Sequence, residues 1–203
     1  MMINKSFSEI TIDTDPFIQF DWWYKEHLNS GIAIPDSVSL GTSSSDGRIS
    51  VRIVLLKGYD ESGFTFFTNY NSKKGSQLSS TGRAAMLFYW PESDRQVRIE
   101  GVGDKIAPEE SDQYFKTRPR ESQLAAWASE QSSVIHGRNS LEKKYDFYKD
   151  KFKNRPVERP PHWGGFRLDP DWFEFWQSAD FRLHDRLTYT KRNEIWLIER
   201  LSP

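Results

Sequence analysis

The spacing of apolar residues divides the chain into a helical start, a strand-rich middle, a second helical stretch and a strand-rich end. Phe17, Phe20 and Leu28 recur at helical spacing after Asp15-Pro16, a pair that favours a helix start, which predicts a helix over residues 15–29. Segments rich in Val, Ile, Phe and Thr then predict strands over residues 37–42, 48–57, 63–69, 83–90 and 95–106, with a short helix over residues 71–81.

Helical spacing returns in the second half of the chain. It predicts helices over residues 108–117, 121–131 and 140–152, the last with a capping box formed by Asn139 and Glu142. Strand patterns resume over residues 163–168, 172–177, 184–190 and 195–201, the last two joined as a hairpin across residues 191–193. Many strands with few, separated helices indicate a mainly β, α+β fold: an antiparallel barrel with helices packed outside it.

The length of 203 residues predicts one domain over residues 15–203, preceded by a flexible arm over residues 1–14 that carries no clear period. Aromatic residues make up 15% of the chain, so we expect a core of few, large side chains. A net charge of −1 provides no basic field for non-specific binding of nucleic acid or of an anionic membrane.

Several classes of site are excluded by composition and motif. The chain has no Cys, which removes disulfides, thiolate zinc sites and thiol nucleophiles, and its four His show no metal-ligand spacing, so no metal is expected. It contains no GxSxG, Walker A or HExxH motif. It also lacks an apolar run long enough for a membrane span and a signal-peptide core, which indicates a soluble, cytoplasmic protein.

Cationic side chains are the residues that indicate a binding site. Arg52 and Lys57 bracket an apolar run that predicts a buried strand, and their alternative interpretation is as solvent-exposed strand ends. Lys73-Lys74 precede a predicted helix, a position where anions bind readily, although such a pair is often only a solvated face. Arg118-Pro-Arg-Glu-Ser122 places two guanidinium groups and a hydroxyl before a helix, or forms an ordinary turn between helices.

The block Arg182-Leu-His-Asp-Arg186 alternates Arg, His and Arg, so a strand would place all three side chains on one face. Packing does not explain that face well, because the groups repel one another unless an anion lies between them. Together the cationic clusters predict the binding of two phosphates, with aromatic surface nearby for stacking a planar ring.

A family resemblance joins these clusters. Blocks that run in order from about residue 35 to the C-terminus resemble the pyridoxine (pyridoxamine) 5′-phosphate oxidase family. They are Arg52–Gly58, Phe67–Asn69, Ser72–Lys74, Leu87–Pro91, Arg95–Val97, Tyr114-Phe115, Arg118–Ser122, Gln131–Ser133, Pro161–Gly165, Glu174–Gln177, Arg182–Arg186 and Ile198–Pro203. The Arg182–Arg186 block distinguishes this family from other flavin split barrels.

The resemblance implies an FMN-binding split β-barrel that works as a homodimer with FMN at the subunit interface. It places FMN against Arg52, Ile53, Val54, Leu55, Leu56, Lys57, Phe67, Thr68, Lys73, Lys74, Gln96, Gln131, Ser132, Trp176 and Arg186. It places the substrate against Lys57, Tyr114, Arg118, Ser122, Arg182, Leu183 and His184, with Arg182 and His184 as the catalytic pair.

The implied reaction is oxidation of pyridoxine 5′-phosphate or pyridoxamine 5′-phosphate to pyridoxal 5′-phosphate. Hydride passes to flavin N5, and O₂ is reduced to hydrogen peroxide. Two alternatives stay open: another split-barrel flavin reductase that uses a different donor, and a non-catalytic protein that binds FMN or pyridoxal phosphate. Retention of Arg182, His184 and Arg186 argues against both.

Overall fold

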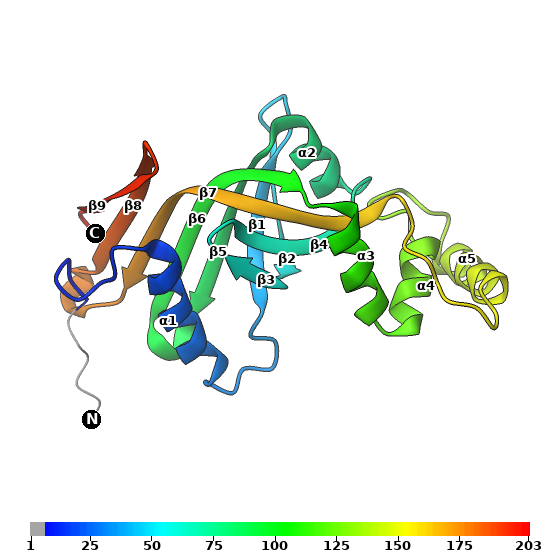
Figure 1. The fold of residues 1–203 in the computed structure, drawn as a ribbon, viewed down its shortest axis with the longest axis horizontal. Coiled ribbons are helices and arrows are strands. Elements are labelled where there is room, and N and C mark those ends of the chain that lie inside the picture. The colour runs from blue at the N-terminus through cyan, green and yellow to red at the C-terminus, as the bar shows by residue number, and fades with distance from the viewer. Residues whose placement is uncertain (1–6) are drawn as a thin grey trace.

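Over the described residues, the fold is a curled, nine-stranded antiparallel sheet with five α-helices that lie beside it and beyond one of its ends (Figure 1). A computed structural model describes residues 7–203. The strands are β1 (Ser37–Ser43), β2 (Ile49–Leu55), β3 (Gly58–Asp60), β4 (Gly63–Asn69), β5 (Arg83–Trp90), β6 (Arg95–Lys105), β7 (Trp163–Gln177), β8 (Asp185–Arg192) and β9 (Ile195–Arg200). The helices are α1 (Pro16–Leu28), α2 (Lys73–Thr81), α3 (Pro108–Thr117), α4 (Arg120–Ala128) and α5 (Arg138–Lys151).

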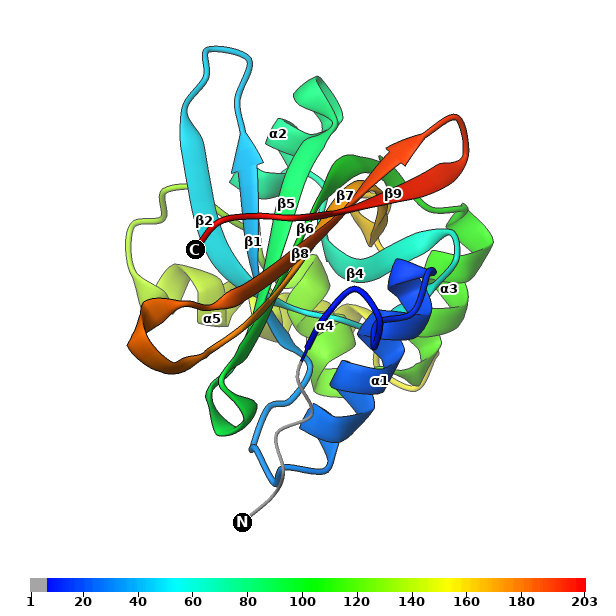
Figure 2. The ribbon, with the colours of Figure 1, turned by 90° about the vertical axis from the view of Figure 1, so that its left-hand side faces the viewer.

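The long strand β7 organises the sheet. The order is β2-β1-β5-β6-β7-β4-β3, and β8 and β9 extend from β7 as a separate hairpin. On one side β7 pairs with β6 along most of its length. On the other side its first part pairs with β4 and its last part with β8. The two partners on that side diverge, so the sheet opens instead of closing into a full barrel, and the β8–β9 hairpin crosses in front of it (Figure 2).

A β-bulge lies at the middle of β7. The register between β6 and β7 shifts between Glu100 and Gly101, so that Glu100 faces Trp172 whereas Gly101 faces Pro170. Asp171 is the extra residue, and Pro170 is tolerated because a bulge relieves the ladder of one donor. This explains why the sequence pattern predicts two strands, 163–168 and 172–177, where the structure has one.

The inner face of the sheet carries an aromatic core closed by α1. Phe20 is fully buried and makes edge contacts with Phe64 and Phe88, while Trp23 packs on Phe175. Asp15 caps α1 by accepting a hydrogen bond from the backbone N–H of Phe17. Burial of such rings is the main source of stability in a chain with few aliphatic residues.

The outer face of β2 and β5 is exposed and apolar. Ile49, Val51, Ile53 and Leu55 alternate along β2 with exposed fractions of 77%, 68%, 62% and 41%. The prediction of a buried strand between Arg52 and Lys57 therefore holds for only one of its two faces. Val54 and Leu56 point to the core, whereas Ile53 and Leu55 do not.

Several boundaries differ from the sequence prediction. Strand β2 ends at Leu55 instead of Lys57, and the hairpin turn is Asn193-Glu194, where both residues have positive φ. Helix α5 begins at Arg138 with Gly137 as its N-cap and no side-chain cap bond, so the predicted capping box does not form. The helix therefore begins two residues before the predicted start at residue 140, so that Asn139 lies inside the helix and cannot cap it.

The predicted N-terminal arm lies partly outside the described residues. In its described part Phe7 is buried against Trp23, with 4.8 Å between ring centroids. The carboxylate of Glu9 accepts hydrogen bonds from Arg200 at 2.7 and 3.0 Å, and this pairing lowers the pKa of Glu9 to about 2. No helix among residues 7–203 is both long and apolar enough to cross a membrane.

Candidate active site

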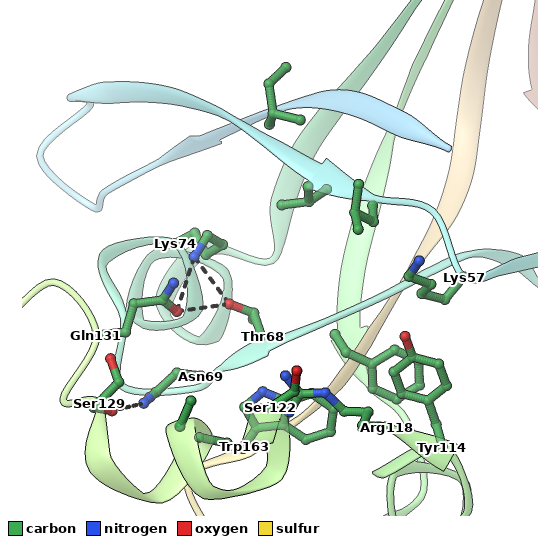
Figure 3. A pocket seen from close by; sticks show the side chains of 16 residues that line it. Lys57, Thr68, Asn69, Lys74, Tyr114, Arg118, Ser122, Ser129, Gln131 and Trp163 are labelled. Carbon is green, nitrogen blue, oxygen red and sulfur yellow. Dashed lines mark hydrogen bonds between the residues drawn. The ribbon is translucent and has the colours of Figure 1, made fainter. Parts of the chain in front are cut away.

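A pocket of about 400 Å³ lies between the end of β2, the end of β4 and helix α4 (Figure 3). It gathers side chains from segments far apart in the sequence, and three of them are cationic. The residues that line it are Ile53, Val54, Leu55, Lys57, Phe67, Thr68, Asn69, Lys74, Tyr114, Arg118, Ser122, Ala125, Ala126, Ser129, Gln131 and Trp163.

Lys74 stands at one end of the pocket in the first turn of α2. Its ammonium donates to Thr68 Oγ1 at 3.1 Å, to Ser72 Oγ at 3.3 Å and to Gln131 Oε1 at 3.3 Å (Figure 3). Only 8% of the residue is exposed, and no carboxylate among the described residues pairs with it. Burial lowers the pKa of Lys74, and the charge of Arg52 lowers it further. A buried ammonium held only by neutral oxygens favours an anionic ligand.

Arg118 stands at the other end of the pocket, between α3 and α4. Its guanidinium lies 4.5 Å from the ring centroid of Trp163, and its Nη1 is buried without a hydrogen-bond partner among the described residues. Burial also lowers the pKa of Arg118. Buried guanidinium N–H groups normally find an acceptor, so this atom marks a place for an acceptor from a ligand.

Lys57 faces the same pocket but is already paired. Its ammonium lies 2.5 Å from Asp36 Oδ2, and both side chains are about a quarter exposed, at 26% each. The backbone on either side is fixed as well, because Leu56 N–H donates to the carbonyl of Asp36 and Lys57 N–H to that of Thr65. Of the three pocket cations, Lys57 is therefore the one with a carboxylate partner.

Stacked aromatic rings form one wall. Phe67 and Tyr114 stack with 3.9 Å between centroids, and Trp163 continues the stack at 5.5 Å from Phe67. The backbone of β7 passes close beneath, because a side chain at Gly165 would collide with Ile106 and contact Phe67. The wall is thus closely packed around Tyr114, and its Trp163 ring lies against Arg118.

A second group of predicted residues lies at the other end of β7. Gln96 faces Trp176 across β6 and β7, and Trp176 faces Arg186 across β7 and β8. The ring of His184 lies 4.7 Å from that of Trp176, and its Nδ1 accepts from the backbone N–H of Ala179. Trp176 lies thirteen positions after Trp163 on β7, roughly 40 Å at about 3.3 Å per residue. A single chain therefore does not bring both groups to one ligand.

The prediction that Arg182, His184 and Arg186 share one strand face is wrong. Strand β8 begins only at Asp185, and Arg182 ends a single 3₁₀ turn, Asp180–Arg182. Phe181 and Arg182 both have left-handed backbone, with φ of 56° and 63°. Non-glycine residues adopt this conformation at a cost, and such strain is concentrated at functional sites. Phe181 and Leu183 on either side are exposed.

The remaining predicted residues lie around the pocket without lining it. Arg52 donates to the carbonyl of Leu40 at 3.1 Å and to Thr42 Oγ1 at 2.6 Å, and its charge lowers the pKa of Lys74. Ser132 has positive φ and accepts from the backbone N–H of Lys73 at 3.2 Å. Leu56 is buried in the core.

Sequence reasoning gave no role to three residues of the site. Asn69 donates to the carbonyl of Ser129 and ties the end of β4 to the loop after α4. The ring of Trp163 lies against the guanidinium of Arg118, and Asp36 pairs with Lys57. Asn69 and Trp163 lie inside the blocks Phe67–Asn69 and Pro161–Gly165, so membership of a block was the sequence signal that could have identified them. Asp36 had none, because its pairing depends on the tertiary fold.

Comparisons with known proteins agree with this geometry. The family model described as Pyridoxamine 5′-phosphate oxidase matches residues 24–149, and that described as Pyridoxine 5′-phosphate oxidase C-terminal dimerisation region matches residues 163–203. A pyridoxine/pyridoxamine 5′-phosphate oxidase of Burkholderia lata is 52% identical over 98% of this chain and 94% of its own length. One from Nostoc punctiforme is 49% identical over 97% and 92%.

Solved structures share the fold. PhzG from Burkholderia lata, in complex with tetrahydrophenazine-1-carboxylic acid, superposes with a TM-score of 0.91 at 30% identity, covering 98% of both chains. A pyridoxamine 5′-phosphate oxidase-related, FMN-binding protein of Nostoc punctiforme superposes with a TM-score of 0.74 at 17% identity, covering 95% of this chain and all of its own. The matches over both halves of the sequence, at about half identity to full-length relatives, establish that this chain belongs to the pyridoxine/pyridoxamine 5′-phosphate oxidase family.

Proposed function

We propose that this protein is an FMN-dependent oxidase that converts pyridoxine 5′-phosphate or pyridoxamine 5′-phosphate to pyridoxal 5′-phosphate. Its relatives at 49% and 52% identity carry this activity in their names. The observation that carries the proposal in this chain is a pair of cations, the buried Lys74 and the half-buried Arg118, which lack anionic partners among residues 7–203 and stand at opposite ends of one pocket. Two separated cationic sites match two phosphates, one on the cofactor and one on the substrate.

The residues around Lys74 fit the phosphate end of FMN. A phosphate monoester carries a charge of roughly −1.5 to −2 at neutral pH, and Lys74, Lys73 and Arg52 supply the opposite charge. Thr68, Gln131 and Ser132 add hydroxyl and amide groups, and the exposed side chains of Ile53 and Leu55 offer an apolar edge for a flat ring. When bound, FMN supplies the hydride acceptor and passes the electrons on to O₂, which yields hydrogen peroxide.

The residues around Arg118 fit the phosphate of the substrate. The unpaired Nη1 offers a donor, Lys57 adds a second charge, and Ser122 and Tyr114 offer hydroxyl groups at the same end of the pocket. A phosphate fixed there holds the pyridine ring at a set distance, so the reacting carbon starts near its attack position. Asp36 keeps Lys57 pointing at this place before the substrate arrives.

Arg182 and His184 complete the site as the catalytic pair. We assign Arg182 to orienting and polarising the pyridine ring, and His184 to supporting it in positioning or in proton transfer. Arg182 is exposed and has left-handed backbone, five positions after Gln177, the last residue of β7.

The site requires two copies of the chain. Residues that face each other in an antiparallel sheet point to the same side, so Ile53, Leu87, Tyr89, Gln96, Trp176 and Arg186 all belong to the outer face. Ile53 and Leu55 also line the pocket, so the pocket opens onto that face. A two-fold contact through the outer face sets the Trp176–Arg186 end of one copy against the pocket of the other. The match to a C-terminal dimerisation region supports this homodimer.

A visible spectrum of the purified protein, followed by anaerobic addition of pyridoxamine 5′-phosphate, tests the proposal. We expect a yellow protein with about one FMN per chain, bleaching of the flavin band on addition, and release of hydrogen peroxide when air is admitted. A protein that is colourless after reconstitution with FMN, or one whose acid-released cofactor is FAD, would overturn the assignment.

The same experiment separates the two alternatives. A split-barrel reductase would be bleached faster by NADPH than by pyridoxamine 5′-phosphate in a stopped-flow comparison. A non-catalytic binding protein would hold FMN without bleaching. Tetrahydrophenazine-1-carboxylic acid, the ligand of the PhzG complex, serves as a further substrate arm. Because its single carboxylate carries less negative charge than a phosphate monoester, it compensates less of the charge of the three pocket cations, and we expect it to react more slowly than pyridoxamine 5′-phosphate.

A further inference from the structure

The outer face of the sheet contains one carboxylate that is almost fully buried. Glu174, in the last part of β7, has a side-chain exposure of 1%. Its Oε1 lies 2.5 Å from Arg186 Nε, and its Oε2 lies 2.8 Å from Arg98 Nη1. A buried carboxylate is costly unless it is paired, and here each oxygen has its own guanidinium. This buried, paired carboxylate lies near the end of β7, beside the second group of predicted site residues.

The pairing fixes the orientation of Arg186. Arg186 is held at two points, because its Nε donates to Glu174 and its Nη1 donates to the carbonyl of Ser202 at 2.9 Å. An arginine has five N–H donors in a planar fork. With Nε and Nη1 both engaged, the plane of the guanidinium is fixed, and donors on Nη1 and Nη2 remain for a ligand. Arg186 therefore presents a pre-set edge of its guanidinium instead of a freely rotating one.

We propose that Glu174 is a positioning residue for the cofactor site: it holds Arg186 in the orientation that binds FMN. This inference rests on the proposed function, which assigns Arg186 to FMN. Holding an arginine in advance lowers the conformational entropy that binding must remove, so the loss of Glu174 weakens FMN binding without removing any group that contacts it.

The chain offers a matched control for the charge. Glu100 pairs with the same Arg98, at 2.8 Å from Nη2, but has an exposure of 45% and makes no contact with Arg186. Glu174→Gln and Glu100→Gln each remove one carboxylate bound to Arg98 while keeping the shape of the side chain. Only the first leaves Arg186 Nε without its charged partner.

The test is a double-mutant cycle read by FMN dissociation. The wild-type holoprotein, Glu174→Gln, Arg186→Ala and the double variant are diluted, and released flavin is measured by fluorescence. We expect Glu174→Gln to raise the Kd for FMN about tenfold and Arg186→Ala to raise it more. The double variant should match Arg186→Ala within about twofold, since Glu174 has nothing left to position. Glu100→Gln should leave the Kd unchanged.

Thermal unfolding separates positioning from simple loss of stability. If Glu174 has only a structural role, Glu174→Gln lowers Tm in both the wild-type and the Arg186→Ala protein. Its effect on the Kd for FMN is then the same in the two proteins. Glu174→Asp, which keeps the charge, serves if Glu174→Gln does not fold, and it should bind FMN more tightly than any neutral variant that folds. An unchanged Kd in Glu174→Gln, or a full further loss in the double variant, would overturn the inference alone. An unchanged Kd in Arg186→Ala would overturn the assignment of Arg186 to FMN as well.

Discussion

Arg118 shows at the residue scale how an unpaired donor predicts a kinetic effect. Its guanidinium lies over Trp163 with Nη1 buried and unpartnered among the described residues. The substrate phosphate does not change charge during the reaction, so this contact contributes equally to ground state and transition state. We expect Arg118→Ala to raise KM for pyridoxamine 5′-phosphate at least tenfold, with kcat within a few-fold of wild type. Steady-state peroxide release measures both, and Lys116→Ala, an exposed neighbour on α3, is the control.

Arg182 should behave in the opposite way. If it orients and polarises the pyridine ring, its interaction strengthens as hydride leaves, and its loss appears in kcat. We expect Arg182→Ala to lower kcat by a factor of at least ten with normal FMN content, and His184→Ala to give an intermediate loss. The flavin absorbance of each variant provides the control. Full kcat with only a higher KM, or loss of the flavin, would remove Arg182 from the catalytic role.

His27 makes stability depend on pH. It is buried on α1, its Nε2 donates to the carbonyl of Pro35 at 3.1 Å, and its Nδ1 has no partner within residues 7–203. Burial lowers the pKa of His27 below its ordinary value. The unfolded chain therefore binds the proton more readily, and stability present above about pH 6.5 is lost as the pH falls below it.

The measurement is urea unfolding at pH 7.5 and pH 5.5. We expect the free energy of unfolding of wild type to fall between the two values by more than that of His27→Gln, which cannot titrate. The variant itself is less stable at both values, so the comparison uses the difference between the two pH values. Equal differences in the two proteins would show that His27 does not titrate on unfolding.

At the scale of a single element, the β-bulge in β7 predicts a large effect of one substitution on stability. A side chain at Gly101 would collide with the backbone of Asp169 and Pro170, which cannot move without breaking the register. We expect Gly101→Ala to lower the free energy of unfolding by about 2 kcal/mol or more, since overpacking against backbone is not relieved by a rotamer change. Gly58→Ala, where the added methyl meets open space, should change it by less than about 0.5 kcal/mol. Urea unfolding of the two variants decides this.

The elements were predicted well where the apolar period alone determines them. The helices at 16–28 and 108–117 and strands such as 63–69 and 83–90 agree with the pattern. Burial alternates along 83–90 and covers both faces of 63–69, so apolar residues mark each of these strands. The continuity of β7 was missed because Asp169-Pro170-Asp171 looks like a turn, and only the partner strand β6 shows it to be a bulge. The turn at Asp180–Arg182 was missed because alternating charges imitate a strand.

The candidate site was only half predictable for the same reason. Sequence blocks identified Lys74, Arg118 and Arg186 as a set, but they contain no information on distance. The structure brings Lys74 and Arg118 to one pocket and leaves Arg186 at the far end of β7. The roles of Asp36 and Glu174 arise from contacts between strands distant in sequence, which no local motif encodes.

At the scale of the whole molecule, the exposed apolar face and the divided site point to the same contact. Exposed apolar patches of this kind mark interaction surfaces. Ile49, Val51 and Ile53 on β2 and Leu87 and Tyr89 on β5 form one such patch beside the pocket mouth. In the proposed homodimer, a second copy seated on this patch covers the apolar residues and supplies the missing residues of the proposed site. Because FMN would then contact both copies, we expect cofactor binding and dimerisation to be linked.

Val51→Lys tests this linkage. Val51 is 68% exposed in the single chain, so a lysine there costs little in the folded monomer. In a two-fold interface the same lysine is buried without a partner, and symmetry places it in the contact twice. We expect Val51→Lys to sediment as a folded monomer and to lose the flavin absorbance together with the dimer. Ile10→Lys, which changes a residue that is 94% exposed and lies outside the sheet, should remain dimeric and yellow. A Val51→Lys protein that stays dimeric with full flavin would place the interface elsewhere, and a monomer that retains its flavin would show that one chain holds FMN alone.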